Sequence, residues 1–422
     1  YKRQDRRIAV AAVSAAAATK RERLHLQALK SWRAGANDDA IAAWEAILDE
    51  HPSDLTALRL AHFSCFWTTG DAHRMRASVE RALSRSAPSA PGPGHGFILG
   101  MHAFACEEAC DYARAESQGR KAVEISAGDL WAVHAIAHVM EMQGRQSEGW
   151  TWVESNQAAT EGATNFKFHL AWHRALFLLE GGFLSELLRW YDESVRELGS
   201  PLVEALPDLY IDVQNAAALL LRLELLEVDV GARWSELADK AERRIGDHVI
   251  LFTVPRWLMA LAAAGRWARC DELLAAMRDY AERGEGSEAA IVSRVGVAAA
   301  QCVLFHRRGE FARALDALFP VRQAIVRLGG SHAQRDVLWQ LMADSAAKAG
   351  RIRGIAPALG RSHARAASRH TADPLPTDLP ELRVVARRRR FSAARRVGIR
   401  RTMYATARHD RGRPRVANES SR

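Results

Sequence analysis

The sequence predicts an all-α fold, an α-solenoid of stacked antiparallel helix pairs over residues 21–350. Three observations lead to this prediction. A turn, usually at a glycine, recurs at intervals near 35 residues, for example from Gly35 to Gly70 and from Gly231 to Gly265. Alanine and leucine, which are strong helix formers, dominate the composition. No segment shows the strict apolar–polar alternation of a half-buried strand.

Each recurring turn is followed by a helix of small residues that carries a large apolar residue a few positions on. These turns begin at Gly35, Gly70, Cys110, Gly144, Gly181, Gly231, Gly265 and Gly309. One helix pair cannot bury its apolar face alone, but stacked pairs share a continuous core and leave a concave surface. The spacing is TPR-like, that of tetratricopeptide repeats with drift, and it predicts about seven helix pairs.

Local signals place several helix ends. The stretch "DEHPSD", residues 49–54, ends one helix with a proline and begins the next with a serine or aspartate cap. Ser331 followed by Gln334 is a capping box that begins a helix after a Gly-Gly turn. The stretch "SAPSAPGPGHG", residues 86–96, predicts a loop by its composition.

Both ends of the chain depart from the repeat. Residues 1–20 have a basic start and an alanine-rich stretch, similar to a weak signal peptide, but they lack leucine and phenylalanine. Because they continue into "RERLHLQALKSW", we favour an N-terminal helical remnant of the array. Residues 351–422 lose the period and are rich in arginine and proline, so they predict a disordered basic tail or a non-native end.

The basic character of the chain belongs to this tail. The whole chain carries a net charge of +9, whereas residues 361–422 hold 17 arginines and 5 acidic residues, a net of +12, which leaves −3 for the rest. Nucleic-acid binding is therefore expected only through the tail. No run reaches the ~18 apolar residues of a membrane span, so no membrane partner is expected. Five sparse cysteines fit a reducing, cytoplasmic location.

The candidate site rests on histidines that are spaced four residues apart. In "WAVHAIAHVMEMQGR", His134 and His138 lie on one helix face, with Glu141 three residues further on. In "NFKFHLAWHRAL", His169 and His173 repeat the spacing, 35 residues after the first pair. Because one repeat length separates the pairs, we expect equivalent places in adjacent repeats and one shared polar pocket.

Three interpretations of these histidines stay open. As neutral imidazoles, His134, His138, His169 and His173 could ligate a divalent metal at Zn–N distances of about 2.0–2.1 Å, with Glu141 as a catalytic base. They could instead line a concave groove that binds a peptide, a protein or a small-molecule ligand. They could also be interior residues that bond carbonyls and carboxylates between helices. The spacing is no zinc-protease signature, because His134 is followed by alanine.

Further residues extend the candidate site. His332 and Asp336 form a third pair with the same spacing. Trp131 and Trp172 accompany the histidines and are candidates to line the groove. Most other tryptophans sit at apolar positions of the helical period, which favours core packing.

The segment "GMHAFACEEAC" carries other polar groups. Of Glu107 and Glu108, at most one is expected to face the groove fully, since adjacent helical residues point about 100° apart. Cys106 and Cys110 lie one helical turn apart. We interpret them as small buried residues rather than as a metal-binding pair.

Two functions follow from these patterns. There is no phosphate-binding glycine loop, dinucleotide fingerprint or nucleophile elbow. The leading hypothesis is a helical-repeat scaffold that binds a ligand or peptide in a histidine-lined groove. The alternative is a metal-dependent enzyme, a hydrolase, that uses the paired histidines.

Several segments resemble the tetratricopeptide-repeat protein 38 family. They are "LGMHAFACEEACDYARAE", "WAVHAIAHVMEMQGR", "NFKFHLAWHRALFLLEGG", "LLRLELLEVDVGARWSELAD" and "GGSHAQRDVLWQ". The resemblance as a whole runs from about residue 21 to 345, and "AHVMEMQGR" and "GGSHAQRD" are the specific pieces. The resemblance implies a helical-repeat fold but no defined reaction.

Three features depart from the family pattern. The helical pair that precedes "RERLHLQAL" in the family is short or absent, and the pattern ends after "SAAKAGRI". In "LFTVPRWLMAL", the family pattern has Asp and His where this chain has Val254 and Arg256. If the family uses those two groups for chemistry, this chain would be impaired.

Overall fold

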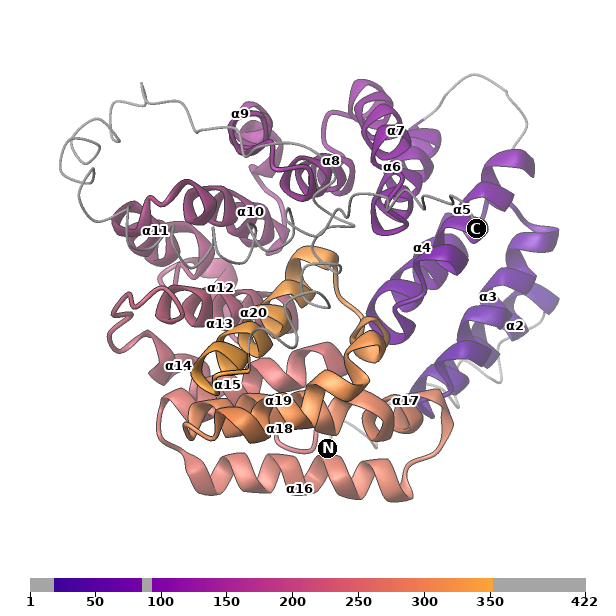
Figure 1. Ribbon diagram of the computed structural model, residues 1–422. Coiled ribbons are helices and arrows are strands. Elements are labelled where there is room, and N and C mark those ends of the chain that lie inside the picture. The colour runs from indigo at the N-terminus through magenta and orange to yellow at the C-terminus, as the bar shows by residue number, and fades with distance from the viewer. Residues whose placement is uncertain (1–18, 86–92, 352–422) are drawn as a thin grey trace, which may run out of the picture.

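The computed structural model describes residues 19–85 and 93–351. Within these residues every regular element is helical, which confirms the all-α prediction. Figure 1 shows the helices following an arc in which the first helices (indigo) and the last ones (orange) lie next to each other, with α20 inside the arc. The expectations for residues 1–18 and for the tail beyond residue 351 lie outside the described residues.

The elements of the first half follow in chain order. They are α2 (Lys20–Arg33), α3 (Asn37–Glu50), α4 (Leu55–Ser64), the π-helical turn η1 (Cys65–Thr69), α5 (Ala72–Arg85), α6 (Pro93–Glu108), α7 (Tyr112–Ile125), α8 (Leu130–Met142), α9 (Gln146–Ser155), the 3-10 turn η2 (Gln157–Thr160), α10 (Phe166–Gly181), α11 (Leu184–Trp190) and the π-helical turn η3 (Tyr191–Val195).

The second half continues the alternation of helices and short turns. It consists of α12 (Pro201–Ala205), α13 (Tyr210–Glu224), α14 (Arg233–Glu242), the 3-10 turn η4 (Leu251–Thr253), α15 (Val254–Ala263), α16 (Trp267–Arg283), α17 (Gly286–Ile291), the π-helical turn η5 (Val292–Gly296), α18 (Val297–Arg307), α19 (Phe311–Leu318), the 3-10 segment η6 (Phe319–Leu328) and α20 (His332–Lys348).

The recurring turns have the backbone conformation that the glycines predicted. The left-handed residues at these turns are Gly35, Gly70, Gly144, Gly182, Gly231, Gly265 and Gly309, all with φ between 57° and 77°. Glycine takes this conformation without the steric penalty that a Cβ brings. Cys110 occupies the equivalent turn after α6 with φ of 63°, although it is not a glycine.

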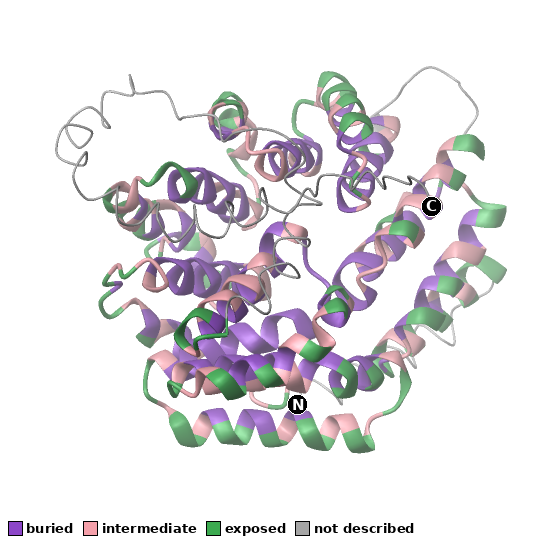
Figure 2. Cartoon of the chain, in the orientation of Figure 1, coloured by how far each residue is buried: buried purple, intermediate pink, exposed green. Residues whose placement is uncertain are grey.

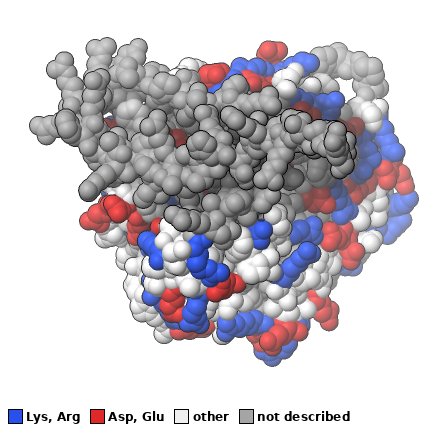
Figure 3. Space-filling view, in the orientation of Figure 1, with Lys and Arg blue, Asp and Glu red and all other residues white. Residues whose placement is uncertain are grey.

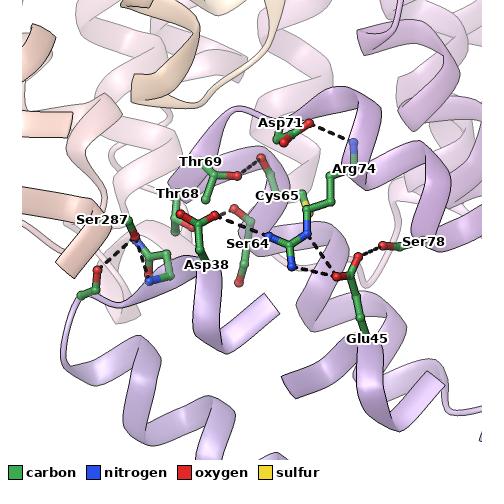
Figure 4. Close-up of polar contacts among 12 residues, drawn as sticks. Asp38, Glu45, Ser64, Cys65, Thr68, Thr69, Asp71, Arg74, Ser78 and Ser287 are labelled. Atoms are coloured by element: carbon green, nitrogen blue, oxygen red, sulfur yellow. Dashed lines mark hydrogen bonds and ion pairs between the residues drawn. The ribbon is translucent and has the colours of Figure 1, made fainter. Parts of the chain in front are cut away.

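Consecutive helices pack on one another along the whole arc, and the two ends of the array meet. α17 packs against α3. The hydroxyl of Ser287 accepts a hydrogen bond from the backbone N–H of Asn37 at 3.0 Å (Figure 4). The backbone N–H of Glu288 donates to the carbonyl of Gly35 at 3.1 Å. The array is therefore closed by backbone contacts between residues about 250 positions apart.

A second closing contact joins η1 to η6. The backbone at Gly70 approaches η6 so closely that a Cβ there would lie 1.7 Å from the carbonyl oxygen of Val326. On the other side of the contact, a Cβ at Gly329 would lie 2.3 Å from the carbonyl oxygen of Trp67. Only glycine fits at either position.

α20 crosses the interior of the arc and packs on α8, α13 and α18. Buried residues gather on the helices that face it, whereas α16 at the rim mixes exposed and buried residues (Figure 2). Two buried arginines hold its first turn. Arg222 of α13 donates to the carbonyl of Ala333 at 2.7 Å, and Arg256 of α15 donates to the carbonyl of Gln334 at 2.9 Å.

The predicted helix ends are largely confirmed. Asp54 caps α4 by accepting from the N–H of Ala57, and Ser331 and Gln334 form the capping box of α20. The predicted loop over residues 86–96 is too long, because α6 begins at Pro93. Proline is well accommodated at the first helical position, where its fixed φ suits the helix and its missing N–H is not needed.

Charges on the described surface are mixed. On the face in Figure 3, lysine and arginine alternate with aspartate and glutamate. One continuous helical stretch, Gly286–Arg307, is long and apolar enough by length and composition to cross a membrane, with a mean hydropathy of 1.5. Of its most apolar window, 61% is buried inside the structure, as in the core helix of a folded protein.

Candidate metal centre

Four buried imidazoles from two neighbouring helices form the candidate site. α8 carries His134 and His138, and α10, which packs on α8, carries His169 and His173. Their exposed fractions lie between 0% and 3%. One ring nitrogen of each residue lies within 4.8 Å of those of the other three. The convergence predicted from spacing and repeat length is present, but the rings are enclosed and do not face an open surface.

His134 stands in the middle of the cluster. Its Nε2 lies 2.8 Å from Nε2 of His138 and 2.8 Å from Nε2 of His169. The ring centre of His173 is 4.3 Å from that of His138 and 5.1 Å from that of His134. In a tetrahedral zinc site the Zn–N distances place neighbouring nitrogens about 3.3–3.4 Å apart. The rings would therefore separate by about half an ångström to admit an ion.

A chain of hydrogen bonds assigns the tautomer of His169. The amide oxygen of Gln334 accepts from the backbone N–H of Ser331 at 3.0 Å, so its amide nitrogen faces the other way. That nitrogen donates to the amide oxygen of Asn215 at 2.9 Å. Asn215 therefore turns its own N–H₂ to Nδ1 of His169, 2.7 Å away. Because Nδ1 accepts this bond, the proton of His169 sits on Nε2.

This assignment leaves the cluster short of hydrogen-bond partners. Nε2–H of His169 points at Nε2 of His134, which has a single lone pair. Nε2 of His138 lies at the same distance from that already occupied acceptor. In addition, Nδ1 of His134, Nδ1 of His138 and Nε2 of His173 are buried and have no partner among the residues that the structure describes. Since each such group costs about 1–3 kcal/mol, the neutral rings do not satisfy one another.

The rings stay uncharged at neutral pH. Burial lowers the pKa of His134, His138 and His169 well below the ordinary value, and it lowers the pKa of His173 to about 3. Neutral imidazole is the form that binds metal ions. The site thus presents uncharged ligands without first having to lose positive charge.

Glu141 lies behind the cluster. Oε2 of Glu141 is 3.0 Å from Nδ1 of His173. The other ring nitrogen of His173, Nε2, has no partner among the described residues. Burial raises the pKa of Glu141 to about 8. A carboxylate at the outer nitrogen of a ligating imidazole orients the ring and increases its basicity. The geometry therefore supports an orienting role for Glu141 toward His173, and the role of catalytic base stays a prediction.

Aromatic rings enclose the imidazoles. Trp172, fully buried, stacks on His169 with ring centres 5.5 Å apart and an interplanar angle of 12°. Trp131 lies 5.0 Å from His134, and Phe104 stacks on the same ring at 5.2 Å. Trp131 and Trp172 thus accompany the histidines as predicted. Apolar walls strengthen electrostatic interactions inside the site because they exclude water.

The third pair does not join the cluster. Nε2 of His332 lies 3.1 Å from the carbonyl oxygen of Glu108, and 31% of the His332 side chain is exposed. The carboxylate of Asp336 lies 3.9 Å from the guanidinium of Arg222. The shared spacing did not predict this outcome, because α20 crosses the array instead of lying parallel to α8 and α10 as a neighbouring repeat would.

Two carboxyls from the end of α6 reach the same region. Glu107 and Glu108 are both buried, with exposed fractions of 0% and 6%, and each has an oxygen within 4.8 Å of a ring nitrogen of His138. Glu108 accepts from the guanidinium of Arg335 at 3.1 Å. Neither oxygen of Glu107 has a well-formed hydrogen bond among the described residues, and burial, followed by the charge and the side-chain contact of Glu108, raises its pKa well above the ordinary value.

The two cysteines of α6 and its turn have different surroundings. Cys106 is fully buried, as expected for a small apolar residue. Cys110 is exposed, and its Sγ lies 3.9 Å from Nε2 of His332. The two thiols therefore do not share one site.

Val254 and Arg256 lie in the first turn of α15. Both residues are buried, with exposed fractions of 1% and 0%. The guanidinium of Arg256 donates to the carbonyls of Phe252 and Gln334. In this chain position 256 thus helps to hold the first turn of α20.

Sequence patterns did not single out Asn215 or Arg222 as parts of the site. Asn215 contacts the site through a side-chain amide in a leucine- and alanine-rich helix, where no spacing signal marks it. Gln334 and Arg335 lie within "GGSHAQRD", one of the two specific segments of the resemblance. This segment was the sequence feature that could have indicated that these two residues belong to the site. A comparison with protein-family models finds no match to this chain.

Proposed function

We propose that the protein binds a divalent transition-metal ion, with zinc as the first candidate, through His134, His138 and His173. One observation carries this proposal: three neutral imidazoles that can offer lone pairs converge in a buried site, beside one imidazole N–H from His169. Three protein ligands with an open fourth position are typical of catalytic zinc sites, whereas structural sites use four.

Metal-assisted hydrolysis is the reaction class that such a site fits. A bound ion would supply a Lewis acid and an activated water. Among the protein groups, Nε2–H of His169 lies beside the three rings that would hold the ion and would be available as a donor, and Glu141 would orient His173. Because the four residues are at most 3% exposed, we infer a small substrate or one that enters when the array opens.

The type of helical repeat and the cellular location are also part of what we propose. We infer that the array is a TPR-like α-solenoid, supported by the recurring left-handed turns and by the packing of consecutive helices. A cytoplasmic location is supported by five free cysteines. A scaffold role for peptide or protein partners remains the second hypothesis, and it expects no metal in the histidine cluster.

Zinc retention by the full chain tests the proposal. The protein, freed of metal with a chelator, is incubated with Zn²⁺, passed through gel filtration in zinc-free buffer and analysed by mass spectrometry. At least one Zn²⁺ per chain is expected to remain. Replacing Zn²⁺ by Co²⁺ should give the intense visible bands of a nitrogen-rich tetrahedral ion. A chain that retains neither ion contradicts the proposal.

The hydrogen-bond chain at Asn215 gives a second expected result. In Asn215→Asp, the carboxylate still accepts from Gln334 but now also accepts from Nδ1 of His169, so the proton leaves Nε2. His169 then becomes a fourth ligand with a carboxylate behind it, and Zn²⁺ affinity is expected to rise by about 10- to 100-fold.

Chelator competition measures this affinity, and nitrogen-15 chemical shifts report the tautomer of His169. Asn215→Leu is the matched control, because it removes the amide without providing a carboxylate, and it should not tighten binding. Equal affinities in the wild type and in Asn215→Asp would contradict the assigned tautomer.

A further inference from the structure

The polar groups at the end of α6 form a second cluster that the four-histidine site does not use. One ligand atom each from Glu107, Glu108 and His138 lies within 4.8 Å of the other two. All three residues are buried, with exposed fractions between 0% and 6%. His138 belongs to both clusters, so the two are adjacent.

The two carboxyls are unequally compensated. Glu108 accepts from Arg335 at 3.1 Å and from the backbone N–H of His332 at 3.2 Å. Glu107 is fully buried, and neither of its oxygens has a hydrogen-bond partner within the described residues. Buried carboxyls are normally hydrogen-bonded, paired with a cation or bound to a metal. Glu107 has no ion pair and no well-formed hydrogen bond among the described residues, and metal binding is the remaining arrangement that would stabilise its ionised form.

His138 has a free donor or acceptor on its second nitrogen. Its Nε2 faces His134 at 2.8 Å, while its Nδ1 is buried without a partner. A neutral imidazole has one lone pair, so His138 can bind an ion at each of its nitrogens only after its N–H proton has been lost to solvent. One imidazole and two carboxylates form a ligand set that suits Zn²⁺, Mn²⁺ or Fe²⁺.

We propose that Glu107, Glu108 and His138 bind a second divalent metal ion, so that the centre is dinuclear, with His138 between the two ions. This inference rests on the proposed function, because it adds a second ion to the four-histidine site. A second positive ion would stabilise the ionised form of both carboxyls, of which only Glu108 has a cationic partner among the described residues.

The stoichiometry of zinc decides the question. The metal-free full chain is loaded with Zn²⁺, gel-filtered and analysed by mass spectrometry. The wild type is expected to hold two Zn²⁺ per chain and Glu107→Gln only one. Glutamine keeps the size of the side chain but lacks the charge. Glu154→Gln, at a half-exposed glutamate on α9 outside both clusters, is the matched control and should hold two.

Cobalt provides a second readout. The first equivalent of Co²⁺ should give intense tetrahedral bands in both the wild type and Glu107→Gln, and only the wild type should show a second, weakly absorbing equivalent. One zinc in both proteins would overturn the second site and leave the four-histidine site standing. Two zincs in both would place the second ion elsewhere and also overturn it. No zinc in the wild type would refute both proposals.

Discussion

Replacing His138 with leucine is expected to abolish retention of Zn²⁺ without destabilising the metal-free protein. Both effects follow from the same geometry. His138 supplies a ring to each ligand cluster, so its loss should weaken binding by more than the about 10- to 100-fold that follows an outer-shell change.

The stability of the metal-free protein should stay equal or rise. Nδ1 of His138 is buried without a partner, and its Nε2 meets an acceptor that His169 already occupies. An apolar side chain of similar size removes a desolvation penalty of about 1–3 kcal/mol for each unsatisfied nitrogen. Thermal unfolding in the presence of a chelator measures this quantity, and chelator competition measures the affinity for Zn²⁺.

His306 offers a matched control. It is a buried histidine on α18, outside both clusters, and its Nε2 lies 2.6 Å from the carboxylate of Asp344. His306→Leu should retain Zn²⁺ but lose stability, since it leaves the partly buried carboxylate of Asp344 without its imidazole partner. If His138→Leu behaved in the same way as His306→Leu, the cluster would be an ordinary interior network and the metal proposal would fail.

The contrast between these two histidines bears on how function is recognised. Some histidines lower the stability of the folded protein and also converge with other possible metal ligands. Such a histidine indicates a binding site, because its unfavourable contribution to stability is retained for the sake of what the site binds. His306 differs from His138 in that its Nε2 contacts the carboxylate of Asp344 on α20, although its Nδ1 also lacks a partner among the described residues. The two histidines are therefore distinguished by this ion-pairing contact and by the convergence of His138 with other possible ligands.

The sequence predicted the parts of the site that depend on local geometry. The spacing of four residues puts His134 beside His138, and the repeat length puts His169 and His173 on the next inner helix. Both are properties of the helix and of the repeat, so they can be read without knowing the path of the chain. The helix caps at Asp54 and Ser331 are local in the same sense.

The rest of the site depends on contacts between distant segments. Gln334 bonds Asn215 across 119 positions, and Arg335 bonds Glu108 across 227. These contacts exist because the array closes and α20 returns to its interior. Neither the period nor the caps predict the curvature that closes the arc. The same return explains why His332 met Glu108 instead of the other histidines.

Closure itself should be testable at Gly70. Gly70→Ala is expected to lower the free energy of unfolding by several kcal/mol more than Gly309→Ala does. Both glycines have positive φ, 61° and 76°, so each substitution carries a left-handed penalty of about 1–2 kcal/mol. At Gly309 a Cβ meets nothing within 4 Å. At Gly70 it would lie 1.7 Å from the carbonyl oxygen of Val326.

The extra loss at Gly70 arises because the obstacle is backbone. A flexible side chain could turn away, but the carbonyl of Val326 belongs to η6, so η6 must move away from η1. η6 leads directly through Gly329 into the capping box at Ser331, from which the bonds to Asn215 and His169 begin. Gly70→Ala should therefore also weaken Zn²⁺ binding, although it lies outside the metal centre. Urea unfolding and chelator competition on both variants check the two effects. Equal losses of stability in Gly70→Ala and Gly309→Ala would show that the η1–η6 contact does not hold the array closed.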